Sequence, residues 1–84
     1  MTGYSSLTDA QLIRAAKRGD HEAFTALAKR YEETVYKFSI KMCRDKQKAA
    51  ENLQDTFISV FRKLGSFDGK SKFSTWLYTI VTNN

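Results

Sequence analysis

The feature that most constrains the fold is a run of apolar residues spaced as on one face of a helix. Apolar side chains recur at intervals of three, four, four, three and four: Phe24, Leu27, Tyr31, Val35, Phe38 and Met42. This spacing follows the 3.6-residue period of an α-helix. Asp20 precedes the run and is a typical N-cap residue. We therefore expect a long amphipathic helix that starts behind Asp20, ends near Arg44 and packs along this seam.

Two further helices flank this one. Thr8 and Gln11 have the spacing of a capping box, which predicts a helix from about Asp9 to Arg18, and Gly19 is suited to end it. Asp45 is a candidate N-cap for a third helix, which should stop at Gly65. The predicted core face of this third helix consists of Ala50, Leu53, Phe57, Val60, Phe61 and Leu64.

The loop GSFDGKSK leads to a last helix, which Ser71 or Ser74 should cap. Its predicted core face consists of Phe73, Leu77, Ile80 and Val81. The 84 residues contain no Pro and only 4 Gly, and no segment alternates with period two. We therefore expect one all-α domain, a compact bundle of about four helices with a short loop before the last.

Composition also limits the class of protein. The single cysteine, Cys43, excludes an internal disulfide. No apolar run approaches the roughly 20 residues of a membrane span, and the first residues do not resemble a signal peptide. We expect a cytoplasmic protein with no membrane contact.

No catalytic constellation is visible. His21 is the only histidine and has no Cys or His companion at ligand spacing. Glu32 and Glu33 are adjacent, so they point about 100° apart on a helix and form no carboxylate pair. The segment GSFDGKS lacks the preceding strand of a phosphate-binding loop. We therefore expect no enzyme, no cofactor and no metal site.

The net charge of +5 is uneven along the chain. Residues 1–34 contain five basic and five acidic side chains, whereas residues 35–84 contain nine basic and four acidic ones. A polyanion such as nucleic acid is one interpretation of this excess, and ordinary solubilising charge is nearly as good an explanation.

Two stripes are not required by the predicted core. On the third helix, one stripe beside the core face consists of Glu51, Gln54, Asp55, Ile58 and Arg62. An apolar residue with a polar rim suits a partner surface, although the stripe taken alone is better explained as a solvated face with one stray Ile.

The second stripe lies on the last helix, where one edge of the core face gathers Thr75, Trp76, Thr79 and Asn83. Trp offers a stacking face and an Asn amide can bond a base edge, while Lys70 and Lys72 before them can meet phosphates. Phe67 looks exposed in the loop and offers a second stacking face. The alternative is that Trp76 simply packs on the core.

Four segments in order resemble region 2 of the extracytoplasmic-function group of bacterial sigma factors, and the resemblance extends from Leu7 to Asn84. The first, LTDAQLIRAAKRGDHEAFTALAKRY, is similar to the opening two helices of that family. ENLQDTFISVFRKL, SFDGKSKF and FSTWLYTIVTN resemble its third helix, its short loop and its fourth helix.

The resemblance implies a transcription initiation factor domain with two partners. Its third helix would bind the clamp of the largest RNA polymerase subunit, through Glu51, Gln54, Asp55, Ile58 and Arg62. The loop and last helix would recognise and melt the promoter minus-ten element as single-stranded DNA, with one base of the non-template strand flipped into a pocket beside the loop. The implied DNA contacts are Phe67, Lys70, Lys72, Trp76, Thr79 and Asn83.

The sequence departs from the family pattern in several places. Asn52 stands where the family usually has Leu, Glu51 replaces the usual Asp and Asp55 the usual Glu. Val81-Thr82 replaces a small residue and its neighbour. The family normally continues into a second, helix-turn-helix domain, so we expect an isolated domain cut from a longer protein or a naturally short one. The family is commonly held inactive by an anti-sigma factor, a possible further partner.

Two other classes of function stay open. A helix-turn-helix protein would bind duplex DNA, but the last helix has no basic residue after Lys72. A helical adaptor would bind protein alone. Comparing single-stranded with duplex DNA separates these possibilities.

Overall fold

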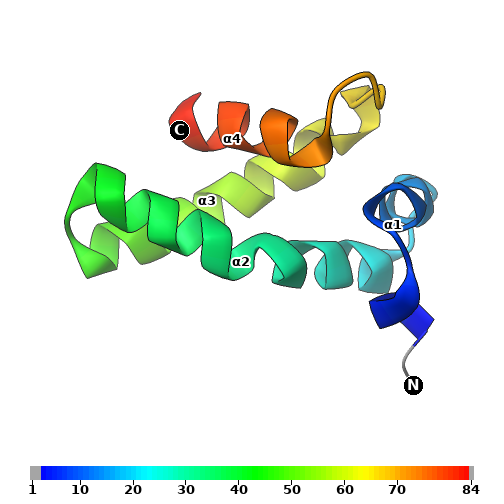
Figure 1. Ribbon diagram of the computed structural model, residues 1–84, viewed down its shortest axis with the longest axis horizontal. Helices are drawn as coiled ribbons and strands as arrows, with labels where there is room; N and C mark the ends of the chain where they lie inside the picture. The colour runs from blue at the N-terminus through cyan, green and yellow to red at the C-terminus, as the bar shows by residue number, and fades with distance from the viewer. Residues whose placement is uncertain (1–2, 84) are drawn as a thin grey trace.

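The computed structural model describes residues 3–83, and within this range the chain forms four α-helices, two short 3-10 helices and no strand (Figure 1). The elements are η1 (Gly3–Ser6), α1 (Asp9–Lys17), α2 (His21–Cys43), α3 (Lys46–Lys63), η2 (Leu64–Ser66) and α4 (Phe73–Asn83). The predicted all-α bundle with a short loop before its last helix is confirmed. No helix in the described range is long and apolar enough to cross a membrane.

The helices form two layers. Figure 1 shows α2 and α3 as a long antiparallel pair, with α4 lying across them and α1 packed against the end where α2 begins. The molecule measures 35 × 29 × 18 Å. The loop between η2 and α4 lies at the same end as α1, so segments about 50 residues apart in the sequence meet there.

Three helix starts match the predicted caps. The Thr8 hydroxyl accepts a hydrogen bond from the Gln11 amide, and the Gln11 side chain accepts one from the Thr8 amide, which completes a capping box. The carboxylate of Asp20 accepts from the Ala23 amide at the start of α2. Asp45 accepts from two amides at the start of α3. These caps satisfy amides that have no partner within the helix.

The start of α4 differs from the prediction. The helix begins at Phe73, and the Lys72 carbonyl accepts a hydrogen bond from the Trp76 amide. Neither Ser71 nor Ser74 therefore occupies the N-cap position. The first residue of the helix, Phe73, is buried in the core, and its ring packs against the rings of Tyr31 and Phe67.

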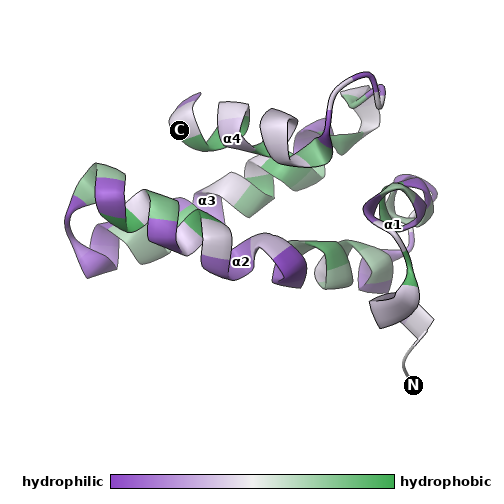
Figure 2. Cartoon of the chain, viewed as in Figure 1, coloured by the Kyte–Doolittle hydropathy of each residue, from purple (hydrophilic) through white to green (hydrophobic). Residues whose placement is uncertain are grey.

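The core lies between the two layers, and Figure 2 shows apolar segments facing one another across them. Leu27 and Val35 of the predicted α2 seam are fully buried, and Phe24, Tyr31 and Phe38 are half-buried. Met42 is 44% exposed, contrary to the prediction. Met42 lies in the last turn of α2, and Figure 1 shows this end of α2 extending beyond the C-terminal end of α4.

The buried face of α3 is rotated from the predicted one. Val60 and Leu64 are buried as expected, but Ala50 is exposed and Phe61 is 51% exposed. Ala49 and Thr56 take the buried positions instead. Small side chains let α2 and α3 approach closely, which leaves the larger apolar residues of α3 at the edge of the contact.

The N-terminal segment is tied to α2 by polar contacts. The Arg30 guanidinium donates to the backbone carbonyls of Tyr4 and Leu7 and forms a 3.0 Å ion pair with Asp9. The Tyr4 hydroxyl donates to Asp20 at 2.8 Å, and this hydrogen bond lowers the pKa of the Asp20 carboxyl. These contacts fix the position of α1, which forms one wall of the site described next.

Candidate nucleic-acid and polymerase interface

Phe67 anchors the loop that joins η2 to α4. Its side chain is only 7% exposed, so the expectation of an exposed stacking face is wrong. The ring packs between two aromatic rings of α4, with centroids 5.8 Å from Phe73 and 5.0 Å from Trp76. Burial of this ring in the core holds the loop against α4 at Phe67.

Polar contacts shape the rest of the loop. The Lys17 ammonium, at the end of α1, donates a hydrogen bond to the Phe67 carbonyl. The Asp68 carboxylate accepts a 3.0 Å bond from the Lys70 amide, which closes a tight turn. Gly69 has φ +78°, a left-handed conformation that glycine adopts without strain.

A pocket of about 540 Å³ opens between α1, this loop and the start of α4. Three basic side chains line it, Arg14, Lys17 and Lys72, together with the carboxylates of Asp9 and Asp68. The other lining residues are Ala10, Ile13, Tyr31, Phe67, Gly69, Phe73 and Ser74. Aromatic and apolar walls with a basic margin suit a flat, polar group attached to an anion, such as a nucleotide.

The lining of this pocket includes a fixed polar pair. The Tyr31 hydroxyl donates a hydrogen bond to Asp9, whose other oxygen holds Arg30. Burial, followed by the bond to Asp9, raises the pKa of Tyr31 to about 12. Tyr31 is therefore protonated at neutral pH. Its hydroxyl proton is used in the hydrogen bond to Asp9, and its oxygen can accept a hydrogen bond from a ligand.

The predicted edge of α4 is present and mostly exposed. Trp76 is half-buried against the core, whereas Thr79 and Asn83 are exposed. The Thr79 hydroxyl donates to the Thr75 carbonyl at 3.2 Å. The Asn83 side chain has no hydrogen bond to any residue that the structure describes, so its amide can donate to and accept from a ligand.

The length of α4 separates Asn83 from the pocket. From Phe73 to Asn83 the helix rises about 15 Å. One base cannot lie against the loop and also meet the Asn83 amide. A base bound in the pocket would therefore differ from any base that Asn83 contacts.

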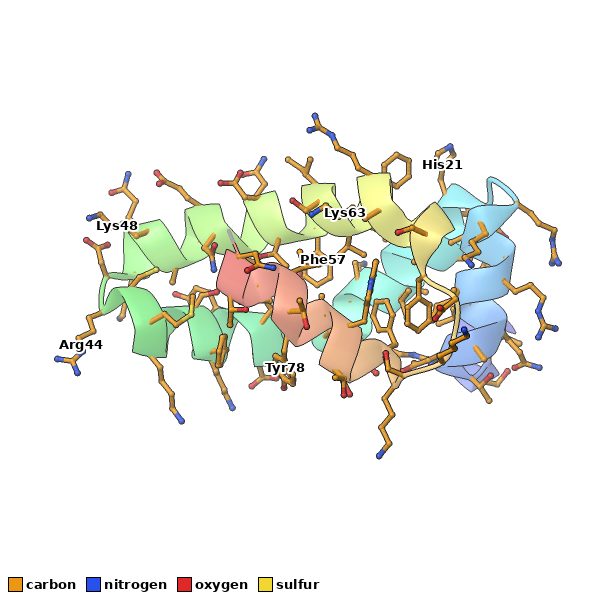
Figure 3. The ribbon with its side chains drawn as sticks, turned by 90° about the horizontal axis from the view of Figure 1, so that it is seen from above. His21, Arg44, Lys48, Phe57, Lys63 and Tyr78 are labelled. Carbon is orange, nitrogen blue, oxygen red and sulfur yellow. The ribbon has the colours of Figure 1, made fainter. Side chains whose placement is uncertain are left out.

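The basic residues of the second part of the chain are not gathered at the pocket. Lys72 lines the pocket, while Lys70 is exposed beside it and does not. Residues 37–48, around the turn between α2 and α3, contain five basic side chains and one acidic, which gives +4 of the net +5. Figure 3 shows Arg44 and Lys48 at this far end of the molecule. Most of the excess charge therefore lies away from the loop.

A second hollow, of about 530 Å³, lies between α2 and α3. Gln54, Ile58 and Arg62 of the predicted stripe line it, whereas Glu51 and Asp55 are exposed beside it. The other lining residues are Phe24, Ala28, Glu32, Ala50, Leu53, Phe57 and Phe61. We call this hollow the α2–α3 groove.

Phe61 is the main addition to the predicted stripe. Its ring is held at the edge of the groove by His21, with centroids 5.9 Å apart, and by Phe24, at 5.2 Å. Ile58 beside it is 44% exposed. The sequence analysis placed Phe61 in the core because it is apolar. The missed signal is that α3 carries more apolar residues than can be buried on one face of the helix. A large exposed apolar pair with a charged rim is typical of a protein-binding surface.

No group of three His, Cys, Asp or Glu side chains within residues 3–83 is arranged to hold a metal ion.

Comparison with known proteins decides the family. The sequence pattern of Sigma-70 region 2 matches residues 27–84, which is most of the chain. The chain belongs to the sigma-70 region 2 family. Among its relatives, the RNA polymerase sigma-H factor of Pseudomonas aeruginosa is 39% identical over 75 residues, 89% of this chain and 39% of the relative. The ECF RNA polymerase sigma factor SigW of Bacillus subtilis is 37% identical over 71 residues, 84% of this chain and 38% of the relative.

A solved structure agrees with this assignment. An engineered region 2 of sigmaE, determined by NMR in complex with GTAAAA, matches with a TM-score of 0.85 and 38% identity, over 92% of this chain and 80% of that one. The resemblance to the extracytoplasmic-function group is thereby confirmed. The sigma region 2 domain spans about two fifths of the length of the curated relatives it matches.

Proposed function

We propose that this sigma region 2 domain recognises the promoter minus-ten element as single-stranded DNA and takes one flipped base into the pocket beside the loop. The observation that carries the proposal is the pocket itself, in which aromatic walls meet three basic side chains at the junction of α1, the loop and α4. The similar region 2 of sigmaE was solved in complex with GTAAAA, which supports a nucleic acid as a ligand of this domain.

The edge of α4 extends this contact along the strand. Trp76 offers the margin of its ring, Thr79 an oxygen and Asn83 a free amide, each about one turn of helix from the next. Lys72 and Lys70 neutralise phosphates, which positions the strand without reading its sequence. Bases held in this way are withdrawn from pairing, so binding favours the melted promoter by mass action.

We propose further that the α2–α3 groove and the charged residues beside it bind the clamp of RNA polymerase. Ile58 and Phe61 supply the apolar centre, and Gln54, Asp55, Glu51 and Arg62 supply a polar rim. This arrangement corresponds to the usual anatomy of a protein interface. The proposal covers the domain as one unit within a transcription initiation factor, with an anti-sigma factor as a possible further partner of the whole protein.

The groove also favours the second candidate, an adaptor that binds protein alone. An adaptor would use the α2–α3 groove but would have no need of a separate basic pocket between α1, the loop and α4. The duplex-binding alternative is less favoured, because the exposed edge of α4 carries no basic residue after Lys72.

The test compares one sequence, selected from a pool of single-stranded oligonucleotides, in single-stranded and duplex form. We expect tighter binding to the single strand, with a shallow slope of log affinity against log salt of about −1.5 to −3, since about two to four phosphates are contacted. Equal or tighter binding to the duplex would favour the helix-turn-helix reading. Absence of binding to either form, with clamp binding intact, would favour the adaptor.

A further inference from the structure

We propose that Lys17 of α1 is a positioning residue for promoter recognition, which holds the loop between η2 and α4 in the shape that forms the base pocket. The inference deepens the proposed function and rests on it for its effect on DNA. It assigns to α1, a helix outside the predicted DNA-binding set, control over which base the pocket accepts.

The first argument concerns how the loop is held. Within the described residues, all but one of the hydrogen bonds of residues 67–72 are local. These local bonds run from the Phe67 amide to Leu64, from the Lys70 amide to Asp68 and from the Trp76 amide to Lys72. The exception is the bond from the Lys17 ammonium to the Phe67 carbonyl, which spans 50 residues of sequence. A hydrogen bond from a charged donor is among the stronger ones in proteins, particularly where it is partly shielded from water.

The second argument concerns what this bond fixes. Phe67 is held on two sides, by its ring between Phe73 and Trp76 and by its carbonyl to Lys17. The next residues, Asp68 and Gly69, form the part of the pocket wall that the loop contributes. Because the loop contains a glycine with positive φ and only short-range bonds beyond Phe67, the direction of the Phe67 carbonyl sets where this wall lies.

The third argument concerns how the helix that carries Lys17 is anchored. Ile13, one turn earlier on α1, is buried in the core, so the helix that carries Lys17 is fixed. Lys17 lines the pocket, and its ammonium reaches the Phe67 carbonyl in the loop. Because the helix is fixed and the loop has few other restraints, the bond between them restrains the position of the loop.

The experiment compares three variants in the complete chain. Lys17→Met removes the donor with little change in side-chain length, and Lys17→Arg keeps both charge and donor. Arg18→Gln is the matched control, because it removes a neighbouring positive charge from an exposed side chain that has no partner within residues 3–83. Circular dichroism and thermal unfolding establish that each variant is folded.

The first readout needs no DNA. Trp76 is the only tryptophan and lies 5.0 Å from the Phe67 ring, so its fluorescence reports the position of the loop. We expect Lys17→Met to increase quenching of Trp76 by acrylamide, Lys17→Arg to restore the wild-type value and Arg18→Gln to leave it unchanged. Unchanged quenching in Lys17→Met would overturn the proposal.

The second readout is base preference, measured with single-stranded oligonucleotides that differ at one position at a time. We expect Lys17→Met to reduce the preference at the pocket position by roughly three- to tenfold, a fraction of what a hydrogen bond to a charged group contributes. The preference that depends on Asn83 should remain. An equal loss of affinity for all sequences, matched by Arg18→Gln, would show that Lys17 acts only as a charge and would overturn the proposal. If the wild-type domain binds no single strand, the proposed function fails, and the fluorescence readout still decides whether Lys17 holds the loop.

Discussion

The side-chain amide of Asn52 on α3 donates a 2.8 Å hydrogen bond to the hydroxyl of Ser39 on α2, and Ser39 is completely buried. This pair lies within the close contact between the two longest helices. It gives a physical reason for the Asn at a position where the resemblance to the sigma family leads one to expect Leu. A buried hydroxyl needs a partner, and Asn52 supplies it.

The first prediction concerns this pair. Asn52→Leu should lower the free energy of unfolding by about 1–3 kcal/mol, because it leaves the Ser39 hydroxyl buried without its partner. Asn52→Leu combined with Ser39→Ala should recover most of the loss, since replacing both polar groups is far less costly than replacing one. Urea unfolding of the two single variants and the double variant measures the coupling. Simple additivity of the two single effects would show that the bond is not important to stability.

The second prediction concerns pH. The pKa of Tyr31 is raised to about 12, so the folded state keeps this proton where the unfolded chain loses it. Below the ordinary tyrosine pKa of 10.0, Tyr31 is protonated in both states and makes no contribution to the pH dependence of the unfolding free energy. As the pH rises from there towards about 12, the unfolded chain loses the proton first, and the unfolding free energy declines. Absorbance at 295 nm should show Tyr31 ionising late, and Tyr31→Phe should remove the late step. A late step that survives in Tyr31→Phe would assign it to another tyrosine.

The third prediction concerns the α2–α3 groove. Asp55→Lys on the rim and Ile58→Ala in the groove should each weaken binding to a polymerase clamp fragment by about 1–3 kcal/mol if they lie centrally in the interface. Both side chains are exposed, so helicity should be unchanged. Isothermal titration calorimetry measures the affinity, and Lys46→Gln at the other end of α3 serves as the control. Clamp affinity equal to that of the wild type in both variants would remove this groove from the polymerase interface.

The fourth prediction concerns Asn83. Asn83→Ala should cost about 1–3 kcal/mol against the preferred sequence and flatten the preference at one position, since an amide that donates and accepts discriminates between bases. Lys70→Ala should weaken all sequences alike, because a lysine meets the phosphate. Fluorescence anisotropy with a set of singly substituted oligonucleotides measures both. If Asn83→Ala weakens every sequence equally or none, Asn83 only ends the helix and the base is read elsewhere.

Three of the four helix starts and the bundle were predictable because they depend on short-range chemistry. Thr8, Asp20 and Asp45 cap helices through amides two or three residues away, and such contacts are visible as spacing in the sequence. The α2 seam was largely right for the same reason. Met42 was wrong because its burial depends on how far α4 reaches, which no local pattern records.

The site was predictable only in part. The exposed stripe of α3 and the edge of α4 follow from helical spacing, but the pocket does not. Its walls come from residues far apart in sequence, and Lys17 and Arg14 on α1 join it only because α1 packs beside the loop. Phe67 was misplaced because a lone aromatic in a glycine-containing loop gives no sign that two rings of α4 will enclose it.

The central claim is that one base enters the pocket beside the loop while Asn83 contacts another. It is tested most directly by an abasic scan, in which each nucleotide of the preferred single strand loses its base but keeps its phosphate. Ala10, which lines the pocket and is exposed, is replaced by Trp to fill the space. In the wild type we predict that one abasic position, distinct from the one sensitive to Asn83→Ala, costs about 1–3 kcal/mol. In Ala10→Trp that position should cost nothing further, while the Asn83 position keeps its full effect. An identical abasic profile for the wild type and Ala10→Trp would contradict the account.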